Sequence, residues 1–217
     1  MYKMIVAIAG RMASFGAMPL ESHYQVELIE AGCDEAGRGC YAGPVFAAAV
    51  ILPVGFFHPL LNDSKQVKAP VRYELRSYIE EKALAWAVAS VTAEEIDRIN
   101  ILQASYRAMH LALDQLGLRP GFLVVDGNRF PSYSKIPHTC IVQGDGKYAS
   151  IAAASILAKT YRDDYMSELH QQFPHYNWKQ NKGYGTSEHR AAIEEHGLCC
   201  FHRRSFQIQP NQQVLFD

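Results

Sequence analysis

The chain has 217 residues, of which 48% are hydrophobic and 20% are charged, and its formal net charge is −1 at pH 7. This length and composition suit one substantial hydrophobic core, and they exclude a polybasic protein whose whole surface attracts nucleic acid. Any nucleic-acid site must therefore be local. No apolar run approaches the roughly 20 residues that a membrane-spanning helix needs, so no membrane association is expected.

The cysteines and the two ends of the chain bear on location and domain organisation. The five cysteines are odd in number and show no C-x-x-C spacing, which argues against a disulfide framework and a zinc site and favours a reducing, cytoplasmic location. A short apolar stretch near the start is interrupted by Arg11 and is too short for an export signal. We expect residues 1–17 to be a disordered or wrongly assigned extension, residues 18–207 to form one domain and residues 208–217 to be a flexible tail.

Five short apolar segments predict β-strands. They cover residues 26–31, 44–52, 85–91, 121–125 and 139–142. The fourth segment is continuously apolar, which is typical of a strand covered on both faces. Because strands and helices alternate without a strict βαβ rhythm, the sequence predicts an α/β fold with one mixed central sheet flanked by helices.

Helical patterns separate these strands. Pro70 opens a helix whose apolar residues recur on one face from Val71 onward. Thr92 begins a capping box, T-A-E-E, and so starts a second helix. A longer helix follows, with a core stripe that runs from Leu102 to Leu116 before the next glycine ends it.

Two further helices are predicted in the last third of the chain. One runs from about Ala149 to His170, and its small apolar first half predicts deep packing against a neighbour. The other is capped by Thr186 and stops near Gly197. Between them, residues 176–185 form a segment dense in aromatic residues, glycines and cations, which we interpret as a loop.

Acidic residues follow three of the predicted strands. Asp34 and Glu35 follow the first strand, Asp126 the fourth and Asp145 the fifth. If these strands are neighbours in one sheet, the four carboxylates converge and each raises the pKa of the next. A pair of divalent cations removes that conflict, and ligands that are all oxygen favour Mg²⁺ or Mn²⁺ over zinc. Two such ions can activate water and stabilise the leaving oxygen during phosphodiester cleavage.

Other acids are expected to be structural. For any one of the four acids above considered alone, a helix cap or a solvated loop residue would be the preferred interpretation, and only their convergence favours a metal site. For Asp163, Asp164 and Glu168, on the helix after Asp145, we predict a solvated helix face.

Seven motifs in register resemble bacterial ribonuclease HII over about residues 26–206. They are D-E-A-G-R-G at 34–39, N-D-S-K at 62–65, V-D-G at 125–127, G-D at 144–145, A-A-A-S-I-L-A-K at 152–159, N-K-G-Y-G-T at 181–186 and H-R-R-S-F at 202–206. The resemblance implies a ribonuclease H-like catalytic domain at 18–207 with a C-terminal helical segment. It also implies that the metal ligands and catalytic residues are Asp34, Glu35, Asp126 and Asp145.

The activity that the resemblance implies is hydrolysis of the RNA strand in RNA–DNA hybrids. It includes a nick 5′ to a single ribonucleotide in duplex DNA, as in ribonucleotide excision, with 3′-hydroxyl and 5′-phosphate products. In such enzymes Gly37-Arg38-Gly39 contacts the ribose 2′-hydroxyl and Tyr184 stacks on the deoxyribose beyond the junction. The glycines suit this contact, since they admit backbone groups close to the one group that separates RNA from DNA.

Cations near these motifs are candidates for phosphate contacts. They are Lys65, Lys182, Arg203 and Arg204. His189 also matches a position of the family, where a capping or core role competes with a substrate contact. Gln143 stands where the family commonly has lysine, so one cation beside Asp145 is missing. This departure bears on metal affinity or on a phosphate contact.

The tail carries a further resemblance. Gln212-Gln213-Val214-Leu215-Phe216 is similar to the glutamine-led peptides, ending in Leu-Phe, that bind bacterial sliding clamps. A frayed terminus is the competing interpretation.

Two other functions compete with that of a nuclease. An aspartyl-phosphate hydrolase would use Asp34 as nucleophile with one Mg²⁺, but it needs a second acid two residues later, where the chain has Ala36. A non-catalytic binder of hybrid duplexes would not need four acids, which repel phosphate unless metal is bound. The related ribonuclease HIII usually has serine in place of Ala36 and an extra N-terminal domain, which we do not expect here.

Overall fold

The centre of the molecule is one mixed β-sheet, seen in a computed structural model that describes residues 20–207. The strands are β1 (Glu30–Ala36), β2 (Val45–Ile51), β3 (Ala85–Val91), β4 (Phe122–Asp126) and β5 (His138–Ile141), in the order β3-β2-β1-β4-β5. β2 runs antiparallel to β1 and β3, whereas β1, β4 and β5 are parallel. The predicted mixed sheet is therefore confirmed.

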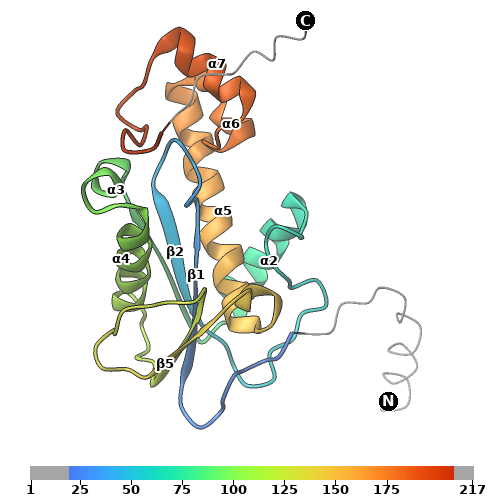
Figure 1. Ribbon diagram of the computed structural model, residues 1–217. Helices are drawn as coiled ribbons and strands as arrows, with labels where there is room; N and C mark the ends of the chain where they lie inside the picture. Colours follow the sequence, from blue (N-terminus) through green and yellow to red (C-terminus); the bar gives the residue numbers. More distant parts are fainter. Residues whose placement is uncertain (1–19, 208–217) are drawn as a thin grey trace, which may run out of the picture.

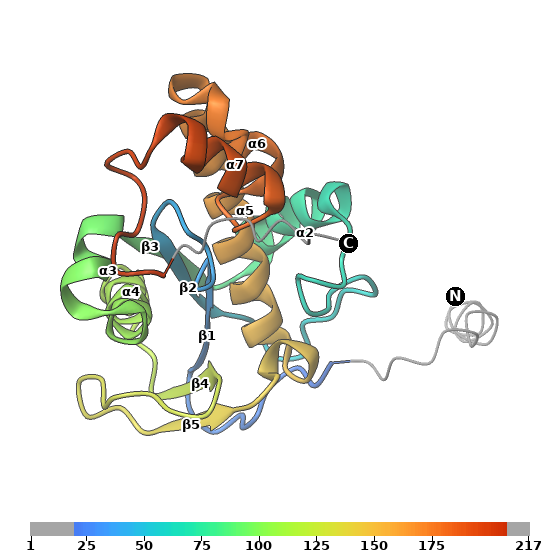
Figure 2. The same cartoon turned by 45° about the horizontal axis from the view of Figure 1, so that its top comes forward.

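Helices cover both faces of this sheet. They are α2 (Ala69–Lys82), α3 (Ala93–Ile99), α4 (Ile101–Asp114), α5 (Ala149–Gln172), α6 (Trp178–Asn181) and α7 (Ser187–His196), with short 3-10 turns η1 (Gly144–Gly146) and η2 (Pro174–Tyr176). α4 packs on one face, and α5 with α2 packs on the other (Figure 1). α6 and α7 gather at the C-terminal end of α5 (Figure 2). Among the described residues, no helix has the length and apolar character to cross a membrane.

The small residues of α5 bring it close to β1. Ala152, Ala153 and Ala154 have no exposed surface. At Gly32 in β1, a Cβ would lie 2.2 Å from the backbone carbon of Ser150, so only glycine allows this approach. This contact places β1 directly beside the first half of α5.

The first strand starts later than the sequence pattern predicted. Residues 24–29 form bends, and the side chain of Glu30 accepts the backbone N–H groups of Tyr24 and Gln25. Val26, predicted as part of the strand, is 66% exposed. The reason is that pairing with β4 begins only at Glu30, opposite Phe122. Asp34 and Glu35 consequently belong to the strand instead of following it.

The predicted helix starts agree with the structure. The Thr92 hydroxyl accepts the N–H of Glu95, and the Thr186 hydroxyl accepts the N–H of His189. In the stripe of α4, by contrast, Leu102 lies in the first turn and is 37% exposed. The segment at 176–185, predicted as a loop, includes the short helix α6. Residues 1–17 and the clamp-like peptide at 212–216 lie outside the described part of the chain.

Candidate active site at the ends of β1 and β4

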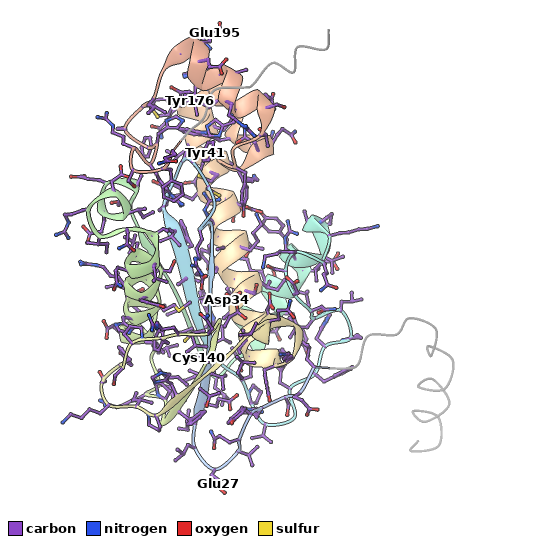
Figure 3. The ribbon with its side chains drawn as sticks, in the orientation of Figure 1. Glu27, Asp34, Tyr41, Cys140, Tyr176 and Glu195 are labelled. Atoms are coloured by element: carbon purple, nitrogen blue, oxygen red, sulfur yellow. The ribbon has the colours of Figure 1, made fainter. Side chains whose placement is uncertain are left out.

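Asp34 and Asp126 come from neighbouring parallel strands. The pairing of Cys33 with Val125 brings the next residue of each strand to the same carboxyl end of the sheet. Because side chains alternate along a strand, Asp34 shares the face of Gly32, which packs on α5. Asp34 is only 5% exposed and lies beside α5 in the middle of the molecule (Figure 3). Such a position is where ligands bind in open α/β sheets.

Asp145 joins this end of the sheet through η1. The Asp126 carboxylate accepts the N–H of Gly144 at 2.7 Å, so one acid of the site holds the turn that carries the next. A Cβ at Gly144 would lie 2.6 Å from the Cδ1 atom of Ile151, so a larger residue there would have to displace the end of that side chain. Gln143 precedes this turn in a left-handed conformation with φ of 55°. Asp145 itself is buried.

Glu35 is oriented differently from Asp34. Strand alternation turns successive side chains to opposite faces of the sheet. The Glu35 carboxylate accepts a hydrogen bond from the Nη1 atom of Arg38 at 3.1 Å, while its own N–H donates to Asp34 at 2.7 Å. Glu35 therefore lies at the rim of the acidic site, partly neutralised by Arg38.

Burial and mutual repulsion raise the pKa of three of these acids. For Asp34, burial is the largest cause, followed by the charges of Glu35 and Asp126. Burial and Asp126 also raise the pKa of Glu35, against the opposing effect of Arg38. Burial, Asp63 and Asp126 raise the pKa of Asp145 to about 6. A positive ion at this site would remove most of this conflict.

Lys65 shows that the acids surround a common position. Its Nζ atom lies 4.0 Å from the Oδ2 atom of Asp145, and its side chain is 83% exposed. Burial opposes its charge, but the carboxylates of Asp145, Asp63, Asp34 and Asp126 raise the pKa of Lys65. Acids from four separate segments of the chain thus raise the pKa of one ammonium group.

Asp63 is a site residue that the sequence reasoning did not single out, although it belongs to the N-D-S-K motif. A cavity of about 750 Å³ opens beside this cluster. Its lining includes Asp63, Lys65, Asp126, Gln143 and Asp145. The cavity is therefore polar, lined by three carboxylates and by the two cations Lys65 and Lys147.

These carboxylates fit a divalent metal by donor type, but they do not form a finished coordination shell. Within residues 20–207, no group of three or more His, Cys, Asp or Glu side chains is arranged so that it could hold a metal ion. One oxygen of Asp126 is bonded to Gly144 and one of Glu35 to Arg38. The donors are oxygen atoms only, and the raised pKa values of Asp34 and Asp145 mean that a bound cation would stabilise their charged forms. Side-chain rotation would have to accompany metal binding.

The two loops predicted to contact substrate are joined by backbone hydrogen bonds. Tyr41 donates its N–H to the carbonyl of Gly183 at 2.8 Å, and Cys40 forms a β-bridge with Tyr184. The Tyr41 side chain marks this junction above the acidic site (Figure 3). The segment Gly37-Arg38-Gly39, which continues directly from β1, therefore lies beside the loop that carries Tyr184.

Tyr184 presents part of its ring to solvent. The residue is 41% exposed, and the Nζ atom of Lys159 lies 5.8 Å from the ring centroid. Its carbonyl is bonded to the Nδ1 atom of His189 at 2.9 Å. His189 is fully buried and its other ring nitrogen accepts from the indole of Trp178, so His189 has the core role.

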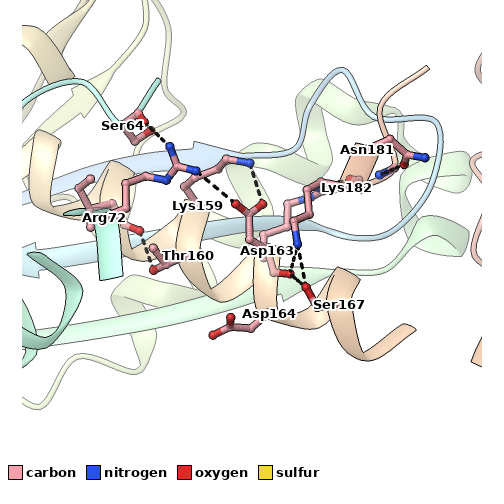
Figure 4. A network of polar contacts seen from close by, with 12 residues as sticks. Ser64, Arg72, Lys159, Thr160, Asp163, Asp164, Ser167, Asn181 and Lys182 are labelled. Atoms are coloured by element: carbon pink, nitrogen blue, oxygen red, sulfur yellow. Dashed lines mark hydrogen bonds and ion pairs between the residues drawn. The ribbon is translucent and has the colours of Figure 1, made fainter. Parts of the chain in front are cut away.

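Lys182 and Asp163 belong to an internal polar network (Figure 4). The Lys182 ammonium donates to the Ser167 hydroxyl at 2.7 Å and to the Asp163 carbonyl at 3.2 Å, and burial lowers its pKa. The Asp163 carboxylate lies 2.7 Å from Lys159 and 3.7 Å from Arg72. Asp163 is 5% exposed, so the prediction of a solvated face was wrong for this residue. Its two cationic partners explain why a carboxylate can be buried there.

Arg203 was wrongly predicted as a phosphate contact. It is fully buried, and its guanidinium donates to the carbonyls of Gly37, Arg38 and Gly43. Arg204, the next residue, is exposed and remains available for such a contact.

The chain matches one protein family over most of its length. A family model described as Ribonuclease HII covers residues 31–209. A ribonuclease HII of Phocaeicola vulgatus is 65% identical over 182 residues, which are 84% of this chain and 90% of that protein.

Solved structures with a similar fold come from related enzymes. The ribonuclease H2 of Pyrococcus horikoshii has a TM-score of 0.69 at 25% identity and covers 82% of this chain and 94% of its own. The structure of a PCNA:RNase HII complex from Archaeoglobus fulgidus has a TM-score of 0.72 at 24% identity, covering 87% and 100%. Bst-RNase HIII in complex with Mn²⁺ has a TM-score of 0.55 at 19% identity, covering 81% and 65%.

Proposed function

Because this chain belongs to the ribonuclease HII family, and is thus a type 2 ribonuclease H that acts on RNA–DNA hybrids, we propose that it also nicks duplex DNA 5′ to a single embedded ribonucleotide. The products are a 3′-hydroxyl and a 5′-phosphate. The observation that carries this proposal is the continuity of β1 with the next loop. The strand delivers Asp34 to the acidic site, and three residues later Gly37-Arg38-Gly39 lies beside Tyr184. In this proposal the acid that binds the catalytic metal and the loop that contacts the ribose are therefore adjacent.

We propose that Asp34, Glu35, Asp126 and Asp145 hold divalent metal, Mg²⁺ or Mn²⁺, as two ions. The manganese complex of the HIII structure supports this use of a divalent ion in a protein of the same fold. Bound ions of this kind supply an activated water and stabilise the leaving oxygen. The raised pKa values of Asp34, Glu35 and Asp145 support the assignment, because these acids gain most from a nearby positive charge.

The other residues bind and orient the substrate in this proposal. Gly39 has no atom within 4 Å of the position a Cβ would take, so its backbone is open to a ribose. The exposed face of Tyr184 offers a surface on which a sugar can stack, and Lys65 offers a cation for the phosphate next to the acids. Lys182 would have to leave Ser167 to contact a phosphate.

The decisive experiment uses a DNA duplex with one ribonucleotide, incubated with Mg²⁺ or Mn²⁺. The wild type should give one nick 5′ to the ribose, and Asp126→Asn should give almost none. Asp114→Asn, an exposed acid at the end of α4, is the matched control and should cut as the wild type does. Equal cutting by Asp126→Asn, or equal cutting of an all-DNA duplex by the wild type, would contradict the proposal.

We also propose that the tail at 212–216 binds a sliding clamp. The archaeal complex with PCNA supports clamp binding as a property of one protein of this fold. Equal clamp binding with and without the last six residues would argue against it.

A further inference from the structure

Two buried arginines converge on the loop after β1. Arg203 has no exposed surface, and all three of its side-chain nitrogens donate to main-chain carbonyls. Nη2 donates to Gly37 at 2.7 Å, Nη1 to Arg38 at 2.8 Å and Nε to Gly43 at 3.0 Å. The contact spans 166 positions between Arg203 and Gly37.

Arg162 holds the other side of the same loop. It is also fully buried, and it donates to the carbonyls of Pro44 at 3.0 Å, Ala42 at 3.0 Å and Lys182 at 2.8 Å. A Cβ at Gly37, whose φ is +95°, would lie 2.0 Å from the Nε atom of Arg162. The positive φ and the nearby Arg162 side chain both favour glycine at position 37, whereas no atom lies within 4 Å of the Cβ position at Gly39.

Neither guanidinium has a carboxylate partner within ion-pair distance among residues 20–207. Burying a cation without an opposite charge is costly, so its hydrogen bonds must compensate. Burial lowers the pKa of Arg203 to about 10, consistent with this cost. Five of the six carbonyls belong to residues 37–44, so the hydrogen bonds of both arginines hold one loop.

The direction of these carbonyls sets the direction of two N–H groups. In a trans peptide, the N–H of one residue points opposite to the carbonyl of the residue before it. The carbonyls of Gly37 and Arg38 point inward to Arg203, so the N–H groups of Arg38 and Gly39 point away from it. Within the described part of the chain, neither N–H has a hydrogen-bond acceptor.

We propose that Arg203 is a positioning residue for sugar discrimination. By holding the carbonyls of Gly37 and Arg38, it fixes two N–H donors toward the substrate, where a ribose 2′-oxygen can accept and a deoxyribose cannot. This inference rests on the proposed function, because it assigns to a buried residue the geometry of the loop that reads the sugar. Lysine cannot replace Arg203, since a single nitrogen lacks the forked donors that reach both carbonyls.

The test measures two dissociation constants for each variant. One duplex carries a single ribonucleotide, and the other has the same sequence in DNA only. Ca²⁺ replaces Mg²⁺ in both measurements, because it is also a divalent cation that binds oxygen but has a looser coordination geometry. Dividing the dissociation constant of the all-DNA duplex by that of the ribonucleotide duplex gives the preference for ribose. Arg203→Lys should lower this ratio by about tenfold, the scale of one lost hydrogen bond. The loss should come from weaker binding of the ribonucleotide duplex, with the all-DNA affinity unchanged. Arg107→Lys, at an exposed arginine of α4, is the matched control, and its ratio should equal that of the wild type.

The outcomes separate positioning from folding. An unchanged ratio for Arg203→Lys, or an equal loss of affinity for both duplexes, would overturn the inference. Circular dichroism checks whether Arg203→Lys is folded. If it is not, Arg203→Gln is measured in its place. Failure of both variants to fold would also overturn it, since Arg203 would then be needed for folding first. A wild-type ratio near one would overturn the proposed function itself, whereas a wild-type preference kept by Arg203→Lys overturns the inference alone.

Discussion

At Asp145 the needs of folding and of the proposed metal binding oppose each other. Burial and the charges of Asp63 and Asp126 raise its pKa from 3.8 to about 6. Below the unfolded pKa the carboxyl is protonated in both states and costs nothing. As the pH rises through the folded pKa, the native state must carry a disfavoured charge, so stability is lost. The chain without metal therefore holds this acid at the expense of its own stability.

We predict that removing this charge stabilises the metal-free protein. In EDTA at pH 7.5, Asp145→Asn should raise the free energy of unfolding by up to about 3 kcal/mol, from the size of the pKa shift. At pH 4 the two proteins should differ little. Urea unfolding at both pH values measures this, with Asp114→Asn as the control. A variant less stable than the wild type at pH 7.5 would contradict the prediction.

At the scale of elements, α5 connects the parts of the site. Its first half packs on β1 beside Asp34, and Lys159 lies near the ring of Tyr184. Asp163 binds Lys159 and Arg72, and Arg72 in turn donates to the carbonyl of Ser64 in the loop that carries Lys65. One helix thus holds the acidic site, the tyrosine loop and the lysine loop in a common frame.

Two adjacent acids on α5 provide a matched comparison. The side chain of Asp163 is 7% exposed, whereas that of Asp164 is 44% exposed and pairs with Arg76. Asp163→Asn should lower the free energy of unfolding by about 2–4 kcal/mol, because two cations lose a buried partner. Asp164→Asn should cost about 1 kcal/mol or less. Urea unfolding at pH 7.5 measures both.

Duplex binding extends this comparison to function. Asp163→Asn should also weaken binding of the ribonucleotide duplex, because the loop that carries Lys65 is attached through Arg72 to Asp163. Asp164→Asn should leave that binding unchanged. Equal effects of the two substitutions on stability would exclude a special role for the buried acid.

For the whole molecule, charge limits how nucleic acid can be bound. The net charge is −1, and several cations near the site are occupied internally. Lys182 donates to Ser167, and Arg203 is buried, whereas Arg38, Lys65, Lys147 and Arg204 are exposed. Binding should therefore depend on a few local phosphate contacts and not on a broad positive surface.

Salt dependence tests this expectation. At fixed Ca²⁺, a plot of log binding constant against log salt should have a slope of about −2 to −4, as expected for two to four phosphate contacts. Lys65→Gln should make the slope shallower by about one, whereas Lys182→Gln should leave it unchanged. Fluorescence anisotropy measures the slopes. A slope steeper than about −6 would require a larger basic surface than the described residues provide.

Local sequence signals were sufficient for most elements and for finding the acids that the structure brings together at one end of the sheet. Thr92 and Thr186 cap helices through neighbours three residues away, and the strand at 85–91 agrees with β3 to the residue. The motifs with Asp34, Asp126 and Asp145 could be recognised because each is short and continuous. Such features depend on residues close in the chain, which a sequence displays directly.

The surroundings of each charge were decided only by the tertiary structure. The start of β1 depends on pairing with β4, and that register brings Asp34 beside Asp126. Nothing next to Arg203 in the sequence shows that it is buried against Gly37, and nothing next to Asp163 shows that Arg72 faces it. Whether a charged side chain faces water, a carbonyl or another charge depends on contacts between distant segments. The sequence alone determined which groups are present, and the packing of β1, α5 and the C-terminal segment determined what each group can bind.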